Sequence, residues 1–253
     1  MSEQGPEKKL LDAVIERSER PANEAVWGIT GSLVGFLVWL LATLVLAVGA
    51  AFLITLVGIS AESVAARYAV ITLSQLLMIA VALGIPLALR ARPAALGPRA
   101  AGVHGLVEAL ALAALLVVFV QGYSWLLSVV APGAYARMLE EVSKQLALLQ
   151  APLGLLMFSA VIAAPLSEEV FFRGFMFRGL RSGMPFIAAA LISSLLFAAI
   201  HLMWFSILPL FLVGMAAAWI MERRQSLVAA FALHAGYNFF SLVWTLVVEP
   251  GTL

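Results

Sequence analysis

The sequence of 253 residues contains no cysteine and little charge. Without cysteine, the chain can form neither disulfides nor thiolate zinc sites. Only 11% of the residues are charged, 63% are apolar, and the mean hydropathy is +1.05. A soluble domain could not hide so much apolar surface from water. We therefore expect an integral membrane protein. The net charge of +1 argues against a nucleic-acid partner.

Uncharged runs long enough to cross a bilayer are the main feature of the sequence, since one span takes about 20 residues. The fifth run is long enough for two helices broken near Trp204 to Ser206, which gives seven candidate spans. We expect an all-α, polytopic integral membrane protein with about seven transmembrane helices and a C-terminal four-helix core. The runs lie at about 25–60, 69–89, 109–133, 151–167, 184–221 and 225–248.

The sequence divides into a charged N-terminal segment, 1–24, N-terminal transmembrane helices, 25–150, and the C-terminal core, 151–248. In the first segment, the apolar side chains would share one helical face, as in a helix at the membrane surface, and a solvated lead-in is an equal alternative. A second amphipathic stretch, 134–149, is expected to lie at the opposite membrane interface. The apolar residues of these two stretches are Leu10, Leu11, Val14 and Ile15, and Met138, Val142 and Leu146.

The basic residues give the orientation, because Lys and Arg gather in cytoplasmic loops. A cytoplasmic N-terminus places all but three of the fifteen Lys and Arg residues on the inner side, and the exceptions are Arg67, Arg137 and Lys144. We expect a multi-pass protein of the cell membrane. The alanine-rich composition and the lack of eukaryotic retrieval signals favour a bacterial inner membrane.

Strongly polar residues inside the apolar segments are few, and such residues are costly at membrane depth. They lie on three successive spans: Glu168 and Glu169, then His201, then His234 with Asn238. Three polar groups on three neighbouring helices indicate a single site.

Helix length predicts that these groups meet at one depth. Glu168 and His201 each lie about 16 positions from the turn at Ser182 to Pro185, or roughly 24 Å along antiparallel helices. His234 is only roughly 14 Å from the turn at Arg223 and Arg224. It reaches the same depth if the preceding helices extend about 10 Å further into the cytoplasm. The site is expected to be sunk in the membrane and open to the cytoplasm.

Helical spacing then suggests a role for each group. Glu169 and Arg173 lie four residues apart, so the arginine can compensate that carboxylate, whereas Glu168 faces elsewhere and is free to act. A glutamate and a histidine across a pocket, here Glu168 and His201, can hold a water and take its proton. His234 and Asn238, also four apart, offer donors for an oxyanion. Together the groups suit amide hydrolysis.

Three ordered motifs carry a resemblance to a known family. They are Glu168-Glu169-x-x-x-Arg173, Phe197-x-x-x-His201 and His234-x-x-x-Asn238. The set resembles the intramembrane proteases that include the CAAX prenyl endopeptidase and the bacteriocin-processing and self-immunity proteins, over residues 151–248.

The resemblance implies an endopeptidase that acts on a membrane-anchored protein or peptide. Glu168 and His201 would activate water, His234 and Asn238 would form the oxyanion site, and Glu169 with Arg173 would support the architecture. The family has been described both as metal-dependent and as metal-free. A metal-free glutamate mechanism is favoured here, and a zinc site would use Glu168, His201 and His234 with water as the fourth ligand.

A second class of function is open at this point. The same Glu and His groups could form a proton relay in a proton-coupled transporter, or belong to an immunity factor that acts by binding alone. A transporter would favour internal repeats with broken helices, and none is seen in the sequence. Catalysis would need Glu168, whereas binding alone would not. Relatives process prenylated proteins, peptide toxins, signalling peptides or anchored surface proteins, and the motifs do not choose among these substrates.

Overall fold

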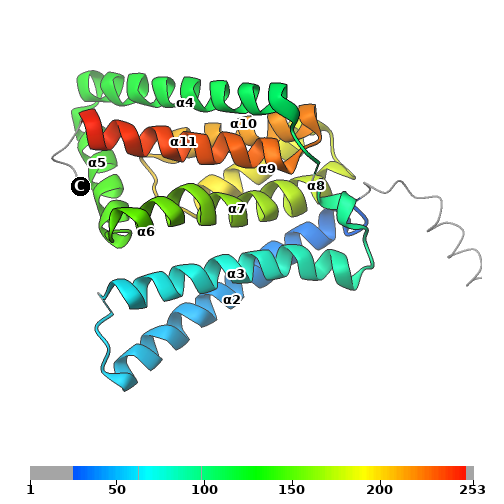
Figure 1. Ribbon diagram of the computed structural model, residues 1–253, viewed down its shortest axis with the longest axis horizontal. Coiled ribbons are helices and arrows are strands. Elements are labelled where there is room, and N and C mark those ends of the chain that lie inside the picture. The colour runs from blue at the N-terminus through cyan, green and yellow to red at the C-terminus, as the bar shows by residue number, and fades with distance from the viewer. Residues whose placement is uncertain (1–24, 62, 98, 249–253) are drawn as a thin grey trace, which may run out of the picture.

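The computed structural model describes residues 25–61, 63–97 and 99–248, and in these ranges its regular structure is entirely helical (Figure 1). The all-α prediction is therefore confirmed. The surface helix proposed around Leu10 to Ile15 lies outside the described residues.

The helices follow the uncharged runs closely, because uninterrupted apolar sequence with few turn residues favours helix in a bilayer. The fifth run is split as expected: one helix ends at Ala199 and the next begins at Ile207. The elements are α2 (Gly28–Val57), α3 (Val64–Ala88), η1 (Pro93–Leu96), α4 (Gly102–Val130), α5 (Pro132–Leu148), α6 (Leu153–Met157), η2 (Phe158–Ala163), α7 (Ala164–Glu169), η3 (Val170–Phe177), α8 (Arg178–Arg181), α9 (Phe186–Ala199), α10 (Ile207–Arg224) and α11 (Leu227–Val248).

Five helices in the described ranges are long and apolar enough to cross a membrane. α6 to α8 form one of them, a continuous helix over Leu153–Arg181, and the others are α2, α3, α4 and α11. α9 is apolar but has only 14 residues, and the last turn of α10 carries Glu222, Arg223 and Arg224. The chain is thus a polytopic membrane protein, and the count of seven spans stays a prediction.

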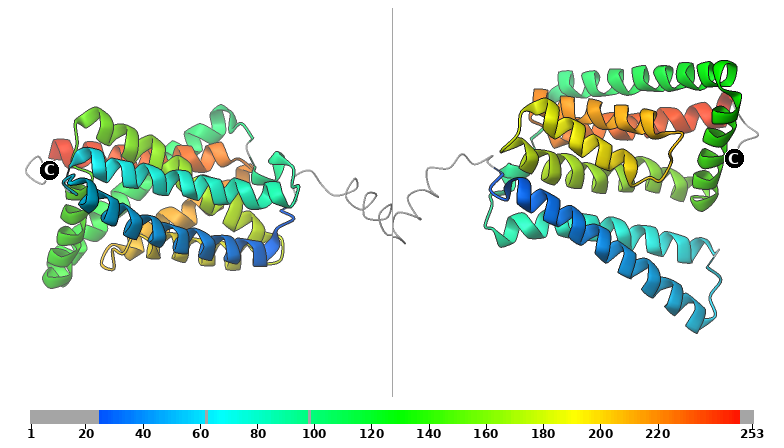
Figure 2. Two further views of the ribbon diagram at one scale, coloured as in Figure 1. Left: turned by 90° about the horizontal axis from the view of Figure 1, so that it is seen from below. Right: turned by 180° about the vertical axis from the view of Figure 1, so that it is seen from behind.

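The helices form a bundle and an attached hairpin. α4 lies along α11, α9 lies along α10, and the helix from Leu153 to Arg181 packs beside them (Figure 1). α2 and α3 pair with each other, and α2 slants away from the bundle toward the α2–α3 loop, as the right view in Figure 2 shows. α5 runs across the ends of the bundle helices (Figure 1). The amphipathic stretch at 134–149 is therefore a separate transverse helix.

Aromatic packing joins the hairpin to the bundle. The ring of Trp27 stacks on Phe175 with 5.6 Å between centroids, and the ring of Trp39 lies 5.3 Å from that of Phe171. At Gly35, α2 lies close to η3, because a Cβ added there would be 2.6 Å from the Phe175 ring. Because all these rings are buried, this cluster is the core that fixes the hairpin against the bundle.

Candidate active site

The helix that carries both glutamates is not a regular α-helix. Two π-helical stretches, η2 and η3, flank the six residues of α7, which contains Glu168 and Glu169. π-Helical turns are rare and often occur at functional sites, because they rotate the side chains that follow. The local backbone therefore marks the same residues as the sequence motif does.

Asn238 supplies a hydrogen bond that the backbone of this helix lacks. A π-helical carbonyl bonds to the amide five residues later. For Ala160 that residue is Pro165, which has no N–H. The side-chain amide of Asn238 donates instead to the Ala160 carbonyl, at 2.8 Å. One of the two N–H groups of Asn238 thus holds α11 against η2, and the other is left for a different acceptor.

Glu169 and Arg173 form the ion pair that their spacing predicted. Glu169 Oε1 lies 3.0 Å from Arg173 Nη1, and both side chains are almost completely buried. Arg173 also donates to the Gly214 carbonyl at 3.1 Å and lies 4.6 Å from the Phe197 ring centroid. A buried charge of this kind persists only when it is paired and hydrogen-bonded, so this cluster ties α7 and η3 to α9 and α10.

His234 lies between the two glutamates. Its Nδ1 is 2.8 Å from Glu169 Oε1, the oxygen that also faces Arg173, and its Nε2 is 3.7 Å from Glu168 Oε2. A carboxylate at Nδ1 fixes the proton on that nitrogen and the ring orientation. Nε2 is therefore the ring position directed toward Glu168. The contacts show that α11 reaches the depth of α7.

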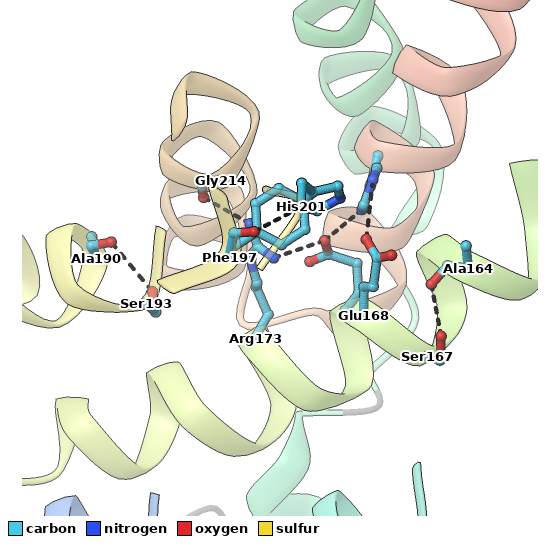
Figure 3. A network of polar contacts seen from close by, with 11 residues as sticks. Ala164, Ser167, Glu168, Arg173, Ala190, Ser193, Phe197, His201 and Gly214 are labelled. Atoms are coloured by element: carbon cyan, nitrogen blue, oxygen red, sulfur yellow. Dashed lines mark hydrogen bonds and ion pairs between the residues drawn. The ribbon is translucent and has the colours of Figure 1, made fainter. Parts of the chain in front are cut away.

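His201 lies two residues after the end of α9. Its Nδ1 lies 2.8 Å from the Phe197 carbonyl, as Figure 3 shows. A carbonyl only accepts hydrogen bonds, so Nδ1 donates and Nε2 is again the free ring nitrogen. In both histidines Nδ1 is therefore held by a hydrogen bond, to a carbonyl in one and to a carboxylate in the other.

Glu168 and His201 line one cavity of about 700 Å³. The prediction that these residues share a depth is consistent with this common cavity. Glu168 is partly accessible, with a side chain 17% exposed, whereas Glu169 is fully buried. The cavity wall comes from α2, α3, α5, α7 and α9, and most of it is apolar. Residues of α2 and α3 therefore form about half of the lining of this cavity. The sequence motifs did not predict this contribution.

Two polar groups in the α2 wall of this cavity have no hydrogen-bond partner. They are Nε1 of Trp39 and Oγ1 of Thr43. By contrast, Trp27, just before α2, donates to the Phe175 carbonyl, and Thr55 in α2 donates to the Ala51 carbonyl. An unsatisfied polar group is costly in an apolar setting, so these two positions differ from the rest of α2.

Sequence reasoning missed two residues that shape the site. The ring of Phe197 lies 4.9 Å from His201 and 5.5 Å from His234, so it separates the two imidazoles. Gly214 brings α10 close to α9, because a Cβ there would lie 2.8 Å from that of Ser194. The spacing Phe-x-x-x-His contained the first signal, whereas nothing in the sequence distinguished Gly214 from other helical glycines.

A zinc site from Glu168, His201 and His234 would need these three groups to converge on one point. In the described ranges, no three His, Cys, Asp or Glu side chains are grouped closely enough to hold a metal ion. Instead, Nδ1 of His234 is hydrogen-bonded to the Glu169 carboxylate. The arrangement does not fit a three-residue zinc site.

Comparison with known families gives a match over the residues of this site. Residues 150–240 match the family described as Type II CAAX prenyl endopeptidase Rce1-like, and all three motifs lie inside the match. This part of the chain is similar to that family. The Rce1-like region begins just before α6 and ends in α11, so it contains the bundle helices that carry Glu168, His201 and His234.

A curated protein matches a shorter stretch of the chain. The UPF0177 protein YxdF of Lactococcus lactis subsp. lactis (strain IL1403) is 32% identical over 81 residues, which are 31% of this chain and 44% of that protein. The match thus spans less than half of the length of that relative. Comparison with solved structures gave no match. The helices that precede the Rce1-like region, α2 to α5, lie outside the family match.

Proposed function

We propose that this protein is an intramembrane endopeptidase that hydrolyses a peptide bond of a membrane-anchored protein or peptide. The observation that carries the proposal is the shared cavity: a partly accessible carboxylate, Glu168, and a histidine with a free Nε2, His201, line one chamber of about 700 Å³. The Rce1-like match over residues 150–240 supports a membrane endopeptidase in general.

The chemistry follows from these two groups. Glu168 accepts a proton from a water held between its carboxylate and Nε2 of His201, and the water oxygen forms a bond to the substrate carbonyl carbon. The carbonyl oxygen becomes an oxyanion. When the C–N bond breaks, the protonated Glu168 returns the proton to the leaving nitrogen. The products are a carboxylic acid and an amine, which become a carboxylate and an ammonium when the acid proton passes to the amine, and the enzyme is restored.

Oxyanion stabilisation falls to His234 and Asn238 in this proposal. Nε2 of His234 is directed toward Glu168 and donates when the ring is protonated on both nitrogens, with its Nδ1–H held by Glu169. The second N–H of Asn238, the one not bonded to Ala160, is the other donor. Donors placed before the reaction stabilise the developing charge without reorganisation. Glu169 and Arg173 act on His234 rather than on the substrate, since Glu169 fixes Nδ1 and Arg173 neutralises Glu169.

The membrane supplies the substrate and sets the direction of approach. Arginines at 90, 92, 99, 178, 181, 223 and 224 lie in or beside turns at one end of the helices, whereas Arg67, Arg137 and Lys144 lie toward the other. Under the positive-inside rule the first end is cytoplasmic. We therefore propose a bacterial inner-membrane protein with a cytoplasmic N-terminus.

The test is a cleavage assay on purified protein in detergent or liposomes, with a panel of membrane-anchored peptides. The wild type is compared with Glu168→Gln and His201→Ala, each with and without a strong chelator. Loss of a general base typically costs about 10²–10⁴-fold in kcat. We expect both variants to lose cleavage at that scale while they keep the wild-type Tm, and we expect the chelator to have no effect.

Two results would change the account. Cleavage by Glu168→Gln at the wild-type rate would remove Glu168 from the reaction and leave a transporter or a binding protein as the alternative. Loss of wild-type cleavage in chelator, restored by added zinc, would replace the metal-free mechanism by a metal-dependent one.

A further inference from the structure

The segment between α9 and α10, residues 200–206, carries His201 but has little regular structure of its own. Leu202, directly after His201, has a positive φ of 55°, which is uncommon for a residue with a branched side chain. A backbone strained at this point persists only if surrounding contacts hold it. The contacts that fix residues 203–206 therefore also fix where His201 lies.

One carboxylate makes most of these contacts. Glu141, in the middle of α5, accepts hydrogen bonds from the Phe205 amide at 3.1 Å and the Ser206 amide at 3.3 Å, and from the Ser206 hydroxyl at 3.4 Å. Ser206 is the N-cap of α10, and its side chain accepts no hydrogen bond from the first amides of that helix. A negative charge at this end of an 18-residue helix is favourable, because the exposed amides carry partial positive charge.

The neighbours of Glu141 on α5 face the same segment. Arg137, one turn earlier, lies 5.6 Å from the Phe205 ring centroid, and Gln145, one turn later, lines the cavity that holds Glu168 and His201. The two neighbouring contacts place this face of α5 against both the segment and the chamber.

Hydrogen bonds from α3 hold the residues that directly follow α5. Tyr68 on α3 donates to the Leu149 carbonyl at 2.7 Å, and Arg67 donates to the Gln150 carbonyl at 2.8 Å. A chain of contacts thus runs from α3 through α5 and Glu141 to the segment after His201. This chain lies mostly outside the Rce1-like match.

We propose that Glu141 is a positioning residue for His201. It holds residues 203–206 and the start of α10, and so keeps the His201 imidazole in the cavity beside Glu168. The proposal rests on the proposed function, because it assigns Glu141 a part in catalysis only through His201.

Glu140 offers a matched control. It is adjacent on α5, is exposed and pairs only with the equally exposed Lys144, at 2.6 Å, among the contacts that the structure shows. Lys144 donates a hydrogen bond that lowers the pKa of the Glu140 carboxyl. Glu140→Ala therefore removes the same charge from the same helix without touching the segment.

The first measurement is hydrogen exchange of the peptide that contains Phe205 and Ser206, in full-length protein in liposomes. Removal of a charged acceptor is worth about a tenfold change in amide opening. We expect Glu141→Ala to raise exchange at these amides about tenfold, Glu140→Ala to leave it unchanged, and Glu141→Gln, which keeps an acceptor oxygen, to lie between them. Unchanged exchange in Glu141→Ala would overturn the proposal.

The second measurement is cleavage kinetics of the same variants, well below the Tm of each. A displaced catalytic group can cost up to about 10²-fold, so we expect kcat to fall tenfold or more in Glu141→Ala with KM retained, and to recover in part in Glu141→Gln. Faster exchange with wild-type kcat would show that Glu141 only stabilises the segment. Absence of cleavage in the wild type would defeat the proposed function, while the exchange result would still report whether Glu141 holds the segment.

Discussion

α2 and the helix from Leu153 to Arg181 have nearly equal length and opposite chemistry. α2 has 30 residues without a charge, and none of its most apolar 18-residue window is buried. The second helix carries Glu168, Glu169 and Arg173, and 39% of its window is buried. The more apolar of these two helices is therefore the less buried one.

The difference reflects the solvent. In a bilayer, apolar side chains gain little from leaving the lipid, whereas ionised groups are stable only inside the protein, beside partners. Leu44 on α2 is 61% exposed, whereas Phe171, two residues after Glu169, is fully buried. The polar helix thus needs the bundle around it, and the apolar helix can form one loose wall of a cavity.

The largest effect on folding is expected from breaking the buried ion pair. Arg173→Met leaves Glu169 charged in an apolar interior, and removing one partner of a buried pair typically costs about 3–5 kcal/mol. We expect a large loss of Tm or of folded protein in detergent. The double variant Glu169→Gln/Arg173→Met should be more stable than Arg173→Met alone, and equal or lower stability of the double variant would contradict the pairing.

A truncation pair tests the contrast in burial directly. Phe171→Ala creates a cavity in the aromatic core and should cost about 3–5 kcal/mol, whereas Leu44→Ala, which faces outward, should change stability by about 0.5 kcal/mol or less. Thermal unfolding of both variants in the same detergent measures the difference. Similar losses at the two positions would mean that α2 is packed against protein at Leu44.

A smaller effect is expected at the junction of Asn238 and Ala160. Asn238→Ala leaves the Ala160 carbonyl unpaired and should cost about 1 kcal/mol, the scale of helix–helix hydrogen bonds in membranes. Adding Pro165→Ala returns an amide to the position five residues after Ala160. The double variant should then regain part of the lost Tm. If Pro165→Ala lowers the Tm equally in both backgrounds, the repair role of Asn238 is wrong.

The smallest effect concerns the unsatisfied groups in the α2 wall. Thr43→Val removes a hydroxyl that has no partner in the structure, so Tm should stay the same or rise. If the hydroxyl meets the substrate main chain, KM should rise several-fold, by about 1 kcal/mol or less. Thr55→Val, at the position where the hydroxyl bonds to its own helix, is the control. Identical KM values for the two variants would remove Thr43 from substrate binding.

The sequence predicted the parts of this site that follow from helical spacing. Glu169 with Arg173 and the positions of the helices could be read from periodicity and from the cost of charge in lipid. The engagement of His234 by Glu169 could not, because it depends on the rotation that the π-helical turns give to α7. Likewise, the sequence offered Asn238 as an oxyanion donor, and its bond to Ala160 depends on the π register beside Pro165.

The sequence was least informative about contacts between distant segments. Nothing in residues 25–150 indicated that α2 and α3 line the cavity, or that Glu141 binds the segment after His201. Such contacts are set by how helices pack, and an amphipathic pattern tells only that α5 has two faces. The described structure also places α4 along α11, across the boundary drawn at residue 150.

The measurement that tests the central claim most directly is a double-mutant cycle of kcat/KM over Glu168→Gln and His201→Ala. If both groups act on one water, either single variant removes most of the catalysis and the double variant is scarcely slower than the worse of the two. Losses that multiply in the double variant would show that the two residues act independently, and would contradict the account of a shared water in the cavity.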